Sequence, residues 1–202
     1  GPDDTVIKRF TSSNLTTLTV GFVRNAISHV LNGTQPLETD DFIHVHNGEF
    51  YHLTEDDKRQ VETGYEDWNY WGMNTTEAYK ESTESDSNLL KSMTPENAYY
   101  FATQLDGIFA YCSYDKKNQD LYVSRDRVGI IPLYYVKEVE EMSLGMDTRV
   151  YERIWFASEA KALIGLGEIH MFAPNTTMRV SFNNIDMKIT KRLILPPYEI
   201  ND

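Results

Sequence analysis

The stretch FIHVHNGEFYH, residues Phe42 to His52, decides how the rest of the chain is interpreted. Apolar and polar side chains alternate in its first half, a pattern typical of a half-buried strand. We expect that strand to end at Asn47-Gly48, because this dipeptide favours a two-residue hairpin turn. Asn47 and Glu49 also place an amide and a carboxylate on either side of a residue without a Cβ. The three residues therefore fit either a simple turn or the edge of a binding pocket.

The composition predicts a soluble, acidic protein of one domain, residues 1–202. Of its 202 residues, 41% are hydrophobic, which is enough to form a substantial core. The formal net charge of −12 argues against nucleic acid or an anionic membrane as the main partner. The chain has no apolar run long enough to span a bilayer and no signal-peptide pattern. The single cysteine, Cys112, excludes an internal disulfide and fits the reducing cytoplasm.

The order of the predicted elements indicates an α+β fold with about eight strands, most of them antiparallel. Three short helices are expected in the middle of the chain, at Thr54–Tyr65, Ser85–Met93 and Thr94–Leu105, the last capped by Thr94. Strands are expected at Asn14–Val23, Phe42–Asn47 and Ile130–Val139, and in Arg153–Leu163, which passes from a strand into a short helix. Two hairpins are expected, Gly107–Asp115 with Asp120–Arg127 and Thr176–Asn184 with Met187–Ile194.

Eight short blocks of sequence occur in the order found in a known family. They are GPDD (1–4), GFVRNAI (21–27), QP (35–36), NGEFYH (47–52), SDSNLL (85–90), LDGIFAYCSYD (105–115), SRDRVGIIPLYY (124–135) and FASEAKAL (156–163). Together they resemble the class II glutamine amidotransferase domain of asparagine synthetases over nearly the whole chain. The last two blocks are the most specific, and they resemble the branch shared with β-lactam synthetases more than the glucosamine-phosphate or purine amidotransferases.

The resemblance implies an N-terminal-nucleophile hydrolase fold, a four-layer α/β/β/α sandwich of two antiparallel sheets. In that family a cysteine at the first position attacks the side-chain amide of glutamine, and its own α-amino group is the base. The ammonia released passes to a synthetase domain, which makes asparagine. The implied partners are therefore glutamine and a synthetase domain. No cofactor is implied for this domain, while ATP and Mg belong to the synthetase domain.

Three side chains match the residues that hold the α-amino and α-carboxylate groups of glutamine in the family. Arg24 resembles the arginine that binds the substrate α-carboxylate, for which a planar guanidinium is suited, and the backbone of Ile27 lies in the same stretch. Glu49 and Asp86 resemble the carboxylates that bind the α-ammonium group. The alternatives stay open at this point, because Arg24 and Glu49 also fit solvated surface charges and Asp86 also fits a helix cap.

Asn47 and Gly48 resemble the oxyanion hole, in which an amide side chain and a backbone N–H stabilise the charge that develops during attack. Removing one such donor typically slows a reaction by roughly 10²–10³-fold. The alternative is the simple Asn-Gly turn described above.

The chain departs from the family at the nucleophile. Family members carry the cysteine on a central strand before the GPDD block, and this sequence opens at that block. We therefore expect a domain truncated at its N-terminus, with a sheet edge that another protein segment could fill. Cys112 lies on an alternating strand, where a cysteine is typically a small buried hydrophobe and not a nucleophile.

Two hypotheses about the function follow, one for an enzyme and one for a binding protein. Either the chain is part of a glutamine-hydrolysing enzyme and is itself inactive, or it is a degenerate amidotransferase fold that acts as a binding or interaction module. Arg125 and Asp126 are expected to form a structural ion pair. His44 and His46 share one strand face and are expected to be exposed, without the spacing of a metal site.

Overall fold

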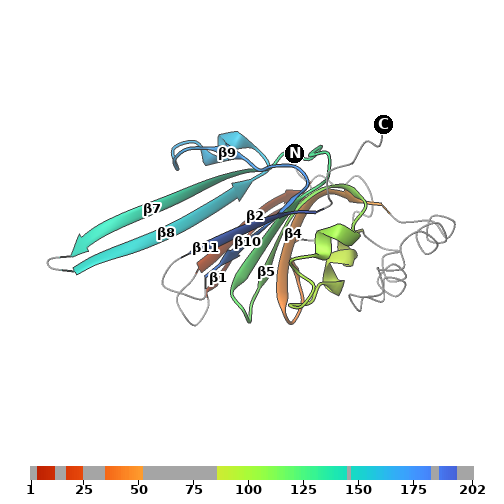
Figure 1. Ribbon diagram of the computed structural model, residues 1–202, viewed down its shortest axis with the longest axis horizontal. Coiled ribbons are helices and arrows are strands. Elements are labelled where there is room, and N and C mark those ends of the chain that lie inside the picture. The colour runs from red at the N-terminus through yellow and green to blue at the C-terminus, as the bar shows by residue number, and fades with distance from the viewer. Residues whose placement is uncertain are drawn as a thin grey trace, which may run out of the picture.

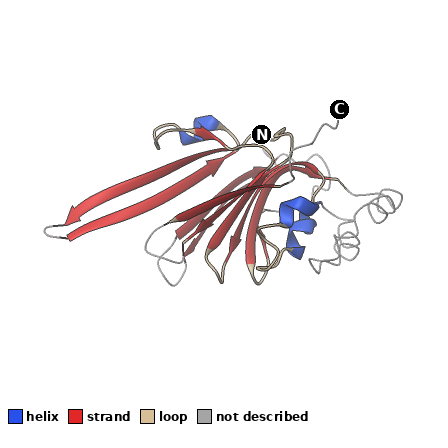
Figure 2. Cartoon of the chain, viewed as in Figure 1, coloured by secondary structure: helices blue, strands red, loops and turns tan. Residues whose placement is uncertain are grey.

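The computed structural model, shown in Figure 1, describes residues 4–11, 17–24, 35–51, 86–144, 147–182 and 187–194. Within these residues the strands form three antiparallel sheets of six, three and two strands. The helices in the same ranges are three short 3-10 helices (Figure 2). This part of the chain is therefore mostly antiparallel sheet with few helices. None of its helices is long and apolar enough to cross a membrane.

The six-stranded sheet carries three of the candidate site residues, Asn47, Gly48 and Glu49. Its strands follow the order β11-β10-β6-β5-β4-β3, and every neighbouring pair is antiparallel. The strands are β3 (Leu37–Glu38), β4 (Phe42–Phe50), β5 (Gly107–Asp115), β6 (Asp120–Arg125), β10 (Thr176–Ser181) and β11 (Lys188–Leu193).

The two smaller sheets contain the remaining strands. One pairs β1 (Asp4–Thr11) with β2 (Thr17–Arg24). The other has the order β8-β7-β9, formed by β7 (Tyr134–Leu144), β8 (Asp147–Ala157) and β9 (His170–Met171). Strands β7 and β8 form a long ribbon that extends away from the rest of the molecule (Figure 1).

The six-stranded sheet buries apolar side chains on both faces, because its strands alternate. On one face Phe42, Phe50 and Tyr111 pack against η2 (Asp86–Ser92) and η3 (Phe101–Gln104). On the other face Ile43 and Val123 lie in a second core, against which side chains of the smaller sheets pack. The described residues thus form a helical layer, the large sheet and a layer of smaller strands.

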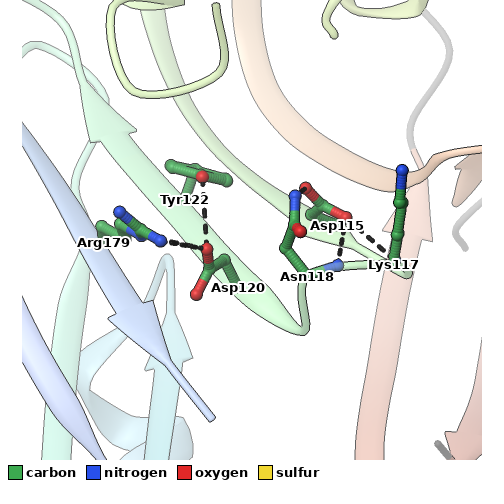
Figure 3. A network of polar contacts seen from close by, with 6 residues as sticks. All are labelled: Asp115, Lys117, Asn118, Asp120, Tyr122 and Arg179. Carbon is green, nitrogen blue, oxygen red and sulfur yellow. Dashed lines mark hydrogen bonds and ion pairs between the residues drawn. The ribbon is translucent and has the colours of Figure 1, made fainter. Parts of the chain in front are cut away.

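Both predicted hairpins are confirmed, and so is the passage from β8 into a short helix, η4 (Ala160–Leu163). In the β5–β6 hairpin the buried Asp115 carboxylate holds the turn (Figure 3). It accepts hydrogen bonds from the backbone N–H groups of Lys117 and Asn118, and from the Asn118 side chain at 2.8 Å. Such a side-chain bond to a nearby backbone N–H is how aspartate favours turns.

A second buried carboxylate follows the turn, and it ties the hairpin to the neighbouring strand β10. One oxygen of Asp120 accepts hydrogen bonds from Nε and Nη2 of Arg179, at 3.0 and 2.6 Å (Figure 3). The Tyr122 hydroxyl lies 3.4 Å from the same oxygen. This contact joins β6 to β10, since Arg179 and Asp120 lie two register positions apart on the neighbouring strands.

Several predicted boundaries are corrected. Strand β2 confirms the strand expected from Asn14, beginning at Thr17, whereas β1 and the outer half of the β7–β8 ribbon were not predicted. The predicted helix Ser85–Met93 is the 3-10 helix η2, and the predicted helix Thr54–Tyr65 lies outside the described residues.

The continuous helix predicted for Thr94–Leu105 is wrong. The expected cap does form, since the Thr94 N–H donates to Asn97 Oδ1 at 2.8 Å and the Asn97 N–H donates to Thr94 Oγ1 at 3.4 Å. The chain then continues as turns and the 3-10 helix η3. Asparagine and the consecutive aromatic residues that follow it are weak α-helix formers, so packing against the sheet determines the local shape.

Candidate functional site

The Asn47-Gly48-Glu49 segment is part of a continuous strand, so the predicted hairpin turn is wrong. Strand β4 runs on to Phe50, and β5 pairs with it along its whole length. Gly48 has a φ of +106°, a conformation that residues with a side chain rarely adopt. A Cβ at this position would lie 2.0 Å from the carbonyl oxygen of Ile108. The segment is therefore a distorted strand at which only glycine fits.

A second glycine faces this distortion from the neighbouring strand. Gly107, the first residue of β5, has a φ of +145°, and a Cβ there would lie 2.2 Å from the carbonyl oxygen of Glu49. The two glycines let the backbones of β4 and β5 approach closely at this end of the pair. Asn47 and Glu49 flank Gly48 on β4, and both are exposed. The amide and carboxylate side chains are thus available to a ligand.

Gln35 fixes the backbone just before this segment. Its side-chain amide donates to the carbonyl of His46 at 3.1 Å, and its Oε1 accepts from the N–H of His46 at 2.7 Å. Gln35 therefore takes the place of a strand partner where β3, which pairs only with Ile43 and His44, does not reach. Gln35 lies in the QP block, but the sequence does not predict this role, because it depends on a contact eleven residues away.

The two histidines of β4 are buried, which contradicts their expected exposure. His46 Nε2 is hydrogen-bonded to Ser87 Oγ at 2.6 Å, and His44 Nδ1 is hydrogen-bonded to Ser113 Oγ at 2.8 Å. The pKa of His44 is lowered to about 3, mainly because burial disfavours the charged imidazolium and also because His46 and Lys116 lie nearby. His44 is thus a neutral core residue at physiological pH.

The His46–Ser87 bond brings one further candidate residue toward the segment. Helix η2 begins at Asp86, and the next residue is Ser87. The backbone of Asp86 therefore lies next to a residue that is hydrogen-bonded to His46, which immediately precedes Asn47 on β4. The Asp86 side chain is outside what the structure describes. Its role as a ligand for an α-ammonium group therefore stays a prediction.

The described part of the structure does not place the remaining two candidates, Arg24 and Ile27, beside β4. Arg24 is the last residue of β2, where it pairs with Asp4 of β1 in a different sheet, and its side chain is not described. Ile27 lies outside the described residues. The proposed convergence of Arg24, Ile27, Glu49 and Asp86 on one ligand stays a prediction.

Arg125 and Asp126 are structural, but the predicted ion pair between them is wrong. Both side chains are buried, and each binds backbone groups of the loop that follows. Asp126 accepts hydrogen bonds from four successive N–H groups, those of residues 128–131, at 2.6–3.3 Å. Arg125 donates to the carbonyls of Gly129, Ile131 and Phe172 at 2.6–2.7 Å. Peptide dipoles therefore compensate both charges.

Cys112 behaves as the small hydrophobe that its strand position predicted. It packs against the second core, and burial raises the pKa of its thiol to about 12. We expect iodoacetamide at pH 8 to alkylate Cys112 about a thousandfold more slowly than a free cysteine, because the thiolate is the reacting form. Mass spectrometry over time measures this rate, and the urea-unfolded chain is the control. Labelling at the free-cysteine rate in the folded state would contradict the assignment.

Clusters of potential metal ligands are absent from the part of the chain that the structure describes. No group of three or more histidine, cysteine, aspartate or glutamate side chains is gathered there as metal ligands would be. What the site offers is a hydrogen-bonding strand segment: an amide, a glycine backbone and a carboxylate on successive residues. Such a set suits a small polar ligand that carries a carbonyl and a positive charge.

Comparison with known proteins identifies the domain. The family model described as glutamine amidotransferase domain matches residues 1–194. The glutamine-hydrolyzing asparagine synthetase 1 of Bacillus subtilis (strain 168) is 31% identical over 146 residues, which are 71% of this chain and 19% of that protein. The asparagine synthetase B of Escherichia coli (strain K12) is 30% identical over 143 residues, 70% of this chain and 21% of that protein.

A third relative aligns along nearly the whole of this chain. The putative glutamine-hydrolyzing asparagine synthetase 2 of Methanocaldococcus jannaschii is 25% identical over 218 residues, 99% of this chain and 35% of that protein. The chain thus spans between 19 and 35% of the length of these curated relatives. The chain belongs to the glutamine amidotransferase domain family, as a class II domain related to the asparagine synthetases.

Proposed function

We propose that this domain binds glutamine for an asparagine-synthetase-like enzyme, in which hydrolysis of the side-chain amide supplies ammonia for asparagine synthesis. The observation that carries the proposal is the Asn47-Gly48-Glu49 segment, a strand distorted at a position where only glycine fits. Neither a surface turn nor an ordinary paired strand requires this combination. The family assignment supplies the substrate class, since the relatives are named for glutamine hydrolysis.

The proposed roles follow the charge and shape of glutamine. Arg24 would bind the α-carboxylate, beside the backbone of Ile27, while Glu49 and Asp86 would bind the α-ammonium group. The Asn47 amide and the Gly48 N–H would donate to the side-chain carbonyl, and more strongly to the oxyanion that forms during attack. The proposal also covers the fold, which we infer to be a four-layer sandwich of the N-terminal-nucleophile hydrolase type. The ATP- and Mg-dependent step belongs to a synthetase domain and not to these residues.

The 202-residue polypeptide is proposed to bind glutamine without hydrolysing it. Attack on the amide carbon needs a nucleophile, and the only cysteine in the sequence has a thiol whose pKa is raised to about 12 by burial. The same observation favours a second candidate function, a non-catalytic amidotransferase fold that recognises glutamine or another partner. Both candidates predict binding, and they differ in whether a longer form of the protein releases ammonia.

The binding test uses two matched carboxylate variants. We expect Glu49→Gln to raise the calorimetric Kd for L-glutamine about tenfold, because a hydrogen bond to a charged group contributes roughly 1.5–3 kcal/mol. Asp41→Asn removes an exposed carboxylate just before β4 and should leave Kd unchanged. The wild-type polypeptide should release no ammonia from glutamine above background.

Two results would count against the proposal. If the wild-type chain gives neither heat nor a thermal shift with millimolar L-glutamine, it carries no amino-acid site of the proposed kind. If Asp41→Asn weakens binding as much as Glu49→Gln, the effect is general electrostatics and not recognition at the segment. Sustained ammonia release by this polypeptide would overturn the claim that it is inactive.

A further inference from the structure

The side chain of Ile131 lies against Gly48 of the candidate segment. A Cβ at Gly48 would lie 2.9 Å from Cγ1 of Ile131, so the two residues are in close contact although 83 positions separate them in the sequence. Ile131 is partly buried and packs against the second core. The space around the Gly48 backbone is therefore limited on one side by β5 and on another by this side chain.

The backbone of Ile131 is held from both directions by two buried charges. Its N–H donates to Asp126 Oδ2 at 3.3 Å, and its carbonyl accepts from Arg125 Nε at 2.7 Å. Arg125 and Asp126 are consecutive, so they act as a clamp around the loop that leads to Ile131. Hydrogen bonds to charged groups are stronger than neutral ones, which makes the position of Ile131 well defined.

The loop is also attached to β5 opposite the segment. The backbone N–H of Asp126 donates to the carbonyl of Phe109 at 2.8 Å, and Phe109 is the register partner of Gly48. A shift of Asp126 would therefore reach Gly48 by two routes, through Phe109 on the neighbouring strand and through the side chain of Ile131.

We propose that Arg125 and Asp126 are positioning residues that hold Ile131 against Gly48 and so fix the Asn47-Gly48 donors at the spacing that a carboxamide requires. This inference rests on the proposed function for its ligand, but the mechanical link between the loop and Gly48 stands apart from any ligand. A loop that only stabilised the fold would not select between ligands with and without a carboxamide.

The first test uses no ligand and measures the link between the loop and Gly48 directly. In an NMR spectrum of the 15N-labelled chain, Ile131→Ala and Asp126→Asn should both move the Gly48 amide signal. Val128→Ala is the matched control, because Val128 lies in the same loop with 73% of its surface exposed and binds Asp126 only through its backbone. If the Gly48 signal stays in place in Ile131→Ala, the proposal is overturned, even where Asp126→Asn fails to fold.

The second test separates positioning from general stability. The ligands are L-glutamine and L-2-aminobutyrate, which has the same α-amino and α-carboxylate groups but ends before the carboxamide. We expect Ile131→Ala to raise Kd for L-glutamine about fivefold, a factor equivalent to one ordinary hydrogen bond. Kd for L-2-aminobutyrate should change less than twofold, and Val128→Ala should change neither.

Each remaining outcome has a defined meaning. Equal weakening of both ligands, or no weakening of L-glutamine, would show that the clamp is only structural and would overturn the proposal. If wild-type chain binds neither ligand, the proposed function fails, and the Gly48 amide signal still decides whether the clamp positions the segment.

Discussion

Replacing Gly48 by alanine should lower the free energy of unfolding by about 3 kcal/mol or more, the range expected when a non-glycine residue is forced into strained backbone with a clash. The physical reason has two parts. The φ of +106° is unfavourable for any residue with a Cβ, and that atom would meet the Ile108 carbonyl oxygen at 2.0 Å. The neighbour is backbone of the paired strand, so it cannot move aside without opening β4 from β5.

The matched control for this variant is Gly21→Ala. Gly21 also lies in a strand, β2, but a Cβ there would have no atom within 4 Å. Urea titration measures both variants, and a fall in the midpoint with an unchanged slope reports lost stability of the native state. Gly21→Ala should unfold at or above the wild-type midpoint, since alanine restricts the unfolded chain. A Gly48→Ala midpoint equal to that of Gly21→Ala would contradict the proposed strain.

The local parts of the fold could be predicted from the sequence because their causes are local. The turn of the β5–β6 hairpin depends on Asp115, and the residues it binds are two and three positions away. The β10–β11 hairpin and the passage from β8 to η4 likewise follow from alternation and turn residues next to each other in the chain. Such features need no knowledge of distant partners.

The continuation of β4 through Asn47-Gly48 could not be predicted in this way. The dipeptide favours a turn by its own propensity, but the paired strand β5 lies about sixty residues further along the chain and keeps the segment extended. The burial of His46 was missed for a related reason, since its partner Ser87 is 41 residues away. Arg125 and Asp126 were predicted to form an ion pair because the sequence places opposite charges next to each other. The sequence does not show that each side chain binds backbone groups instead.

The buried His44 should make the protein lose stability in mild acid. Its pKa is lowered to about 3 in the folded state, against an unfolded value of about 6.5. Because the unfolded chain takes up a proton first, this stability is present above about pH 6.5 and is lost as the pH falls toward 3. From pH 7.5 to pH 5 the loss amounts to about 2 kcal/mol, obtained from the two pKa values by proton linkage.

Two variants isolate this contribution from the titration of the carboxylates. His44→Asn keeps a polar atom near Ser113 but cannot take up a proton, so its free energy of unfolding should fall about 2 kcal/mol less than that of the wild type over the same pH range. His170→Asn removes an exposed histidine of β9 and should retain the wild-type slope. Urea titrations at half-unit pH intervals measure the three slopes. Identical slopes for wild type and His44→Asn would mean that the pKa of His44 is the same in the folded and the unfolded chain, and that burial does not disfavour the imidazolium.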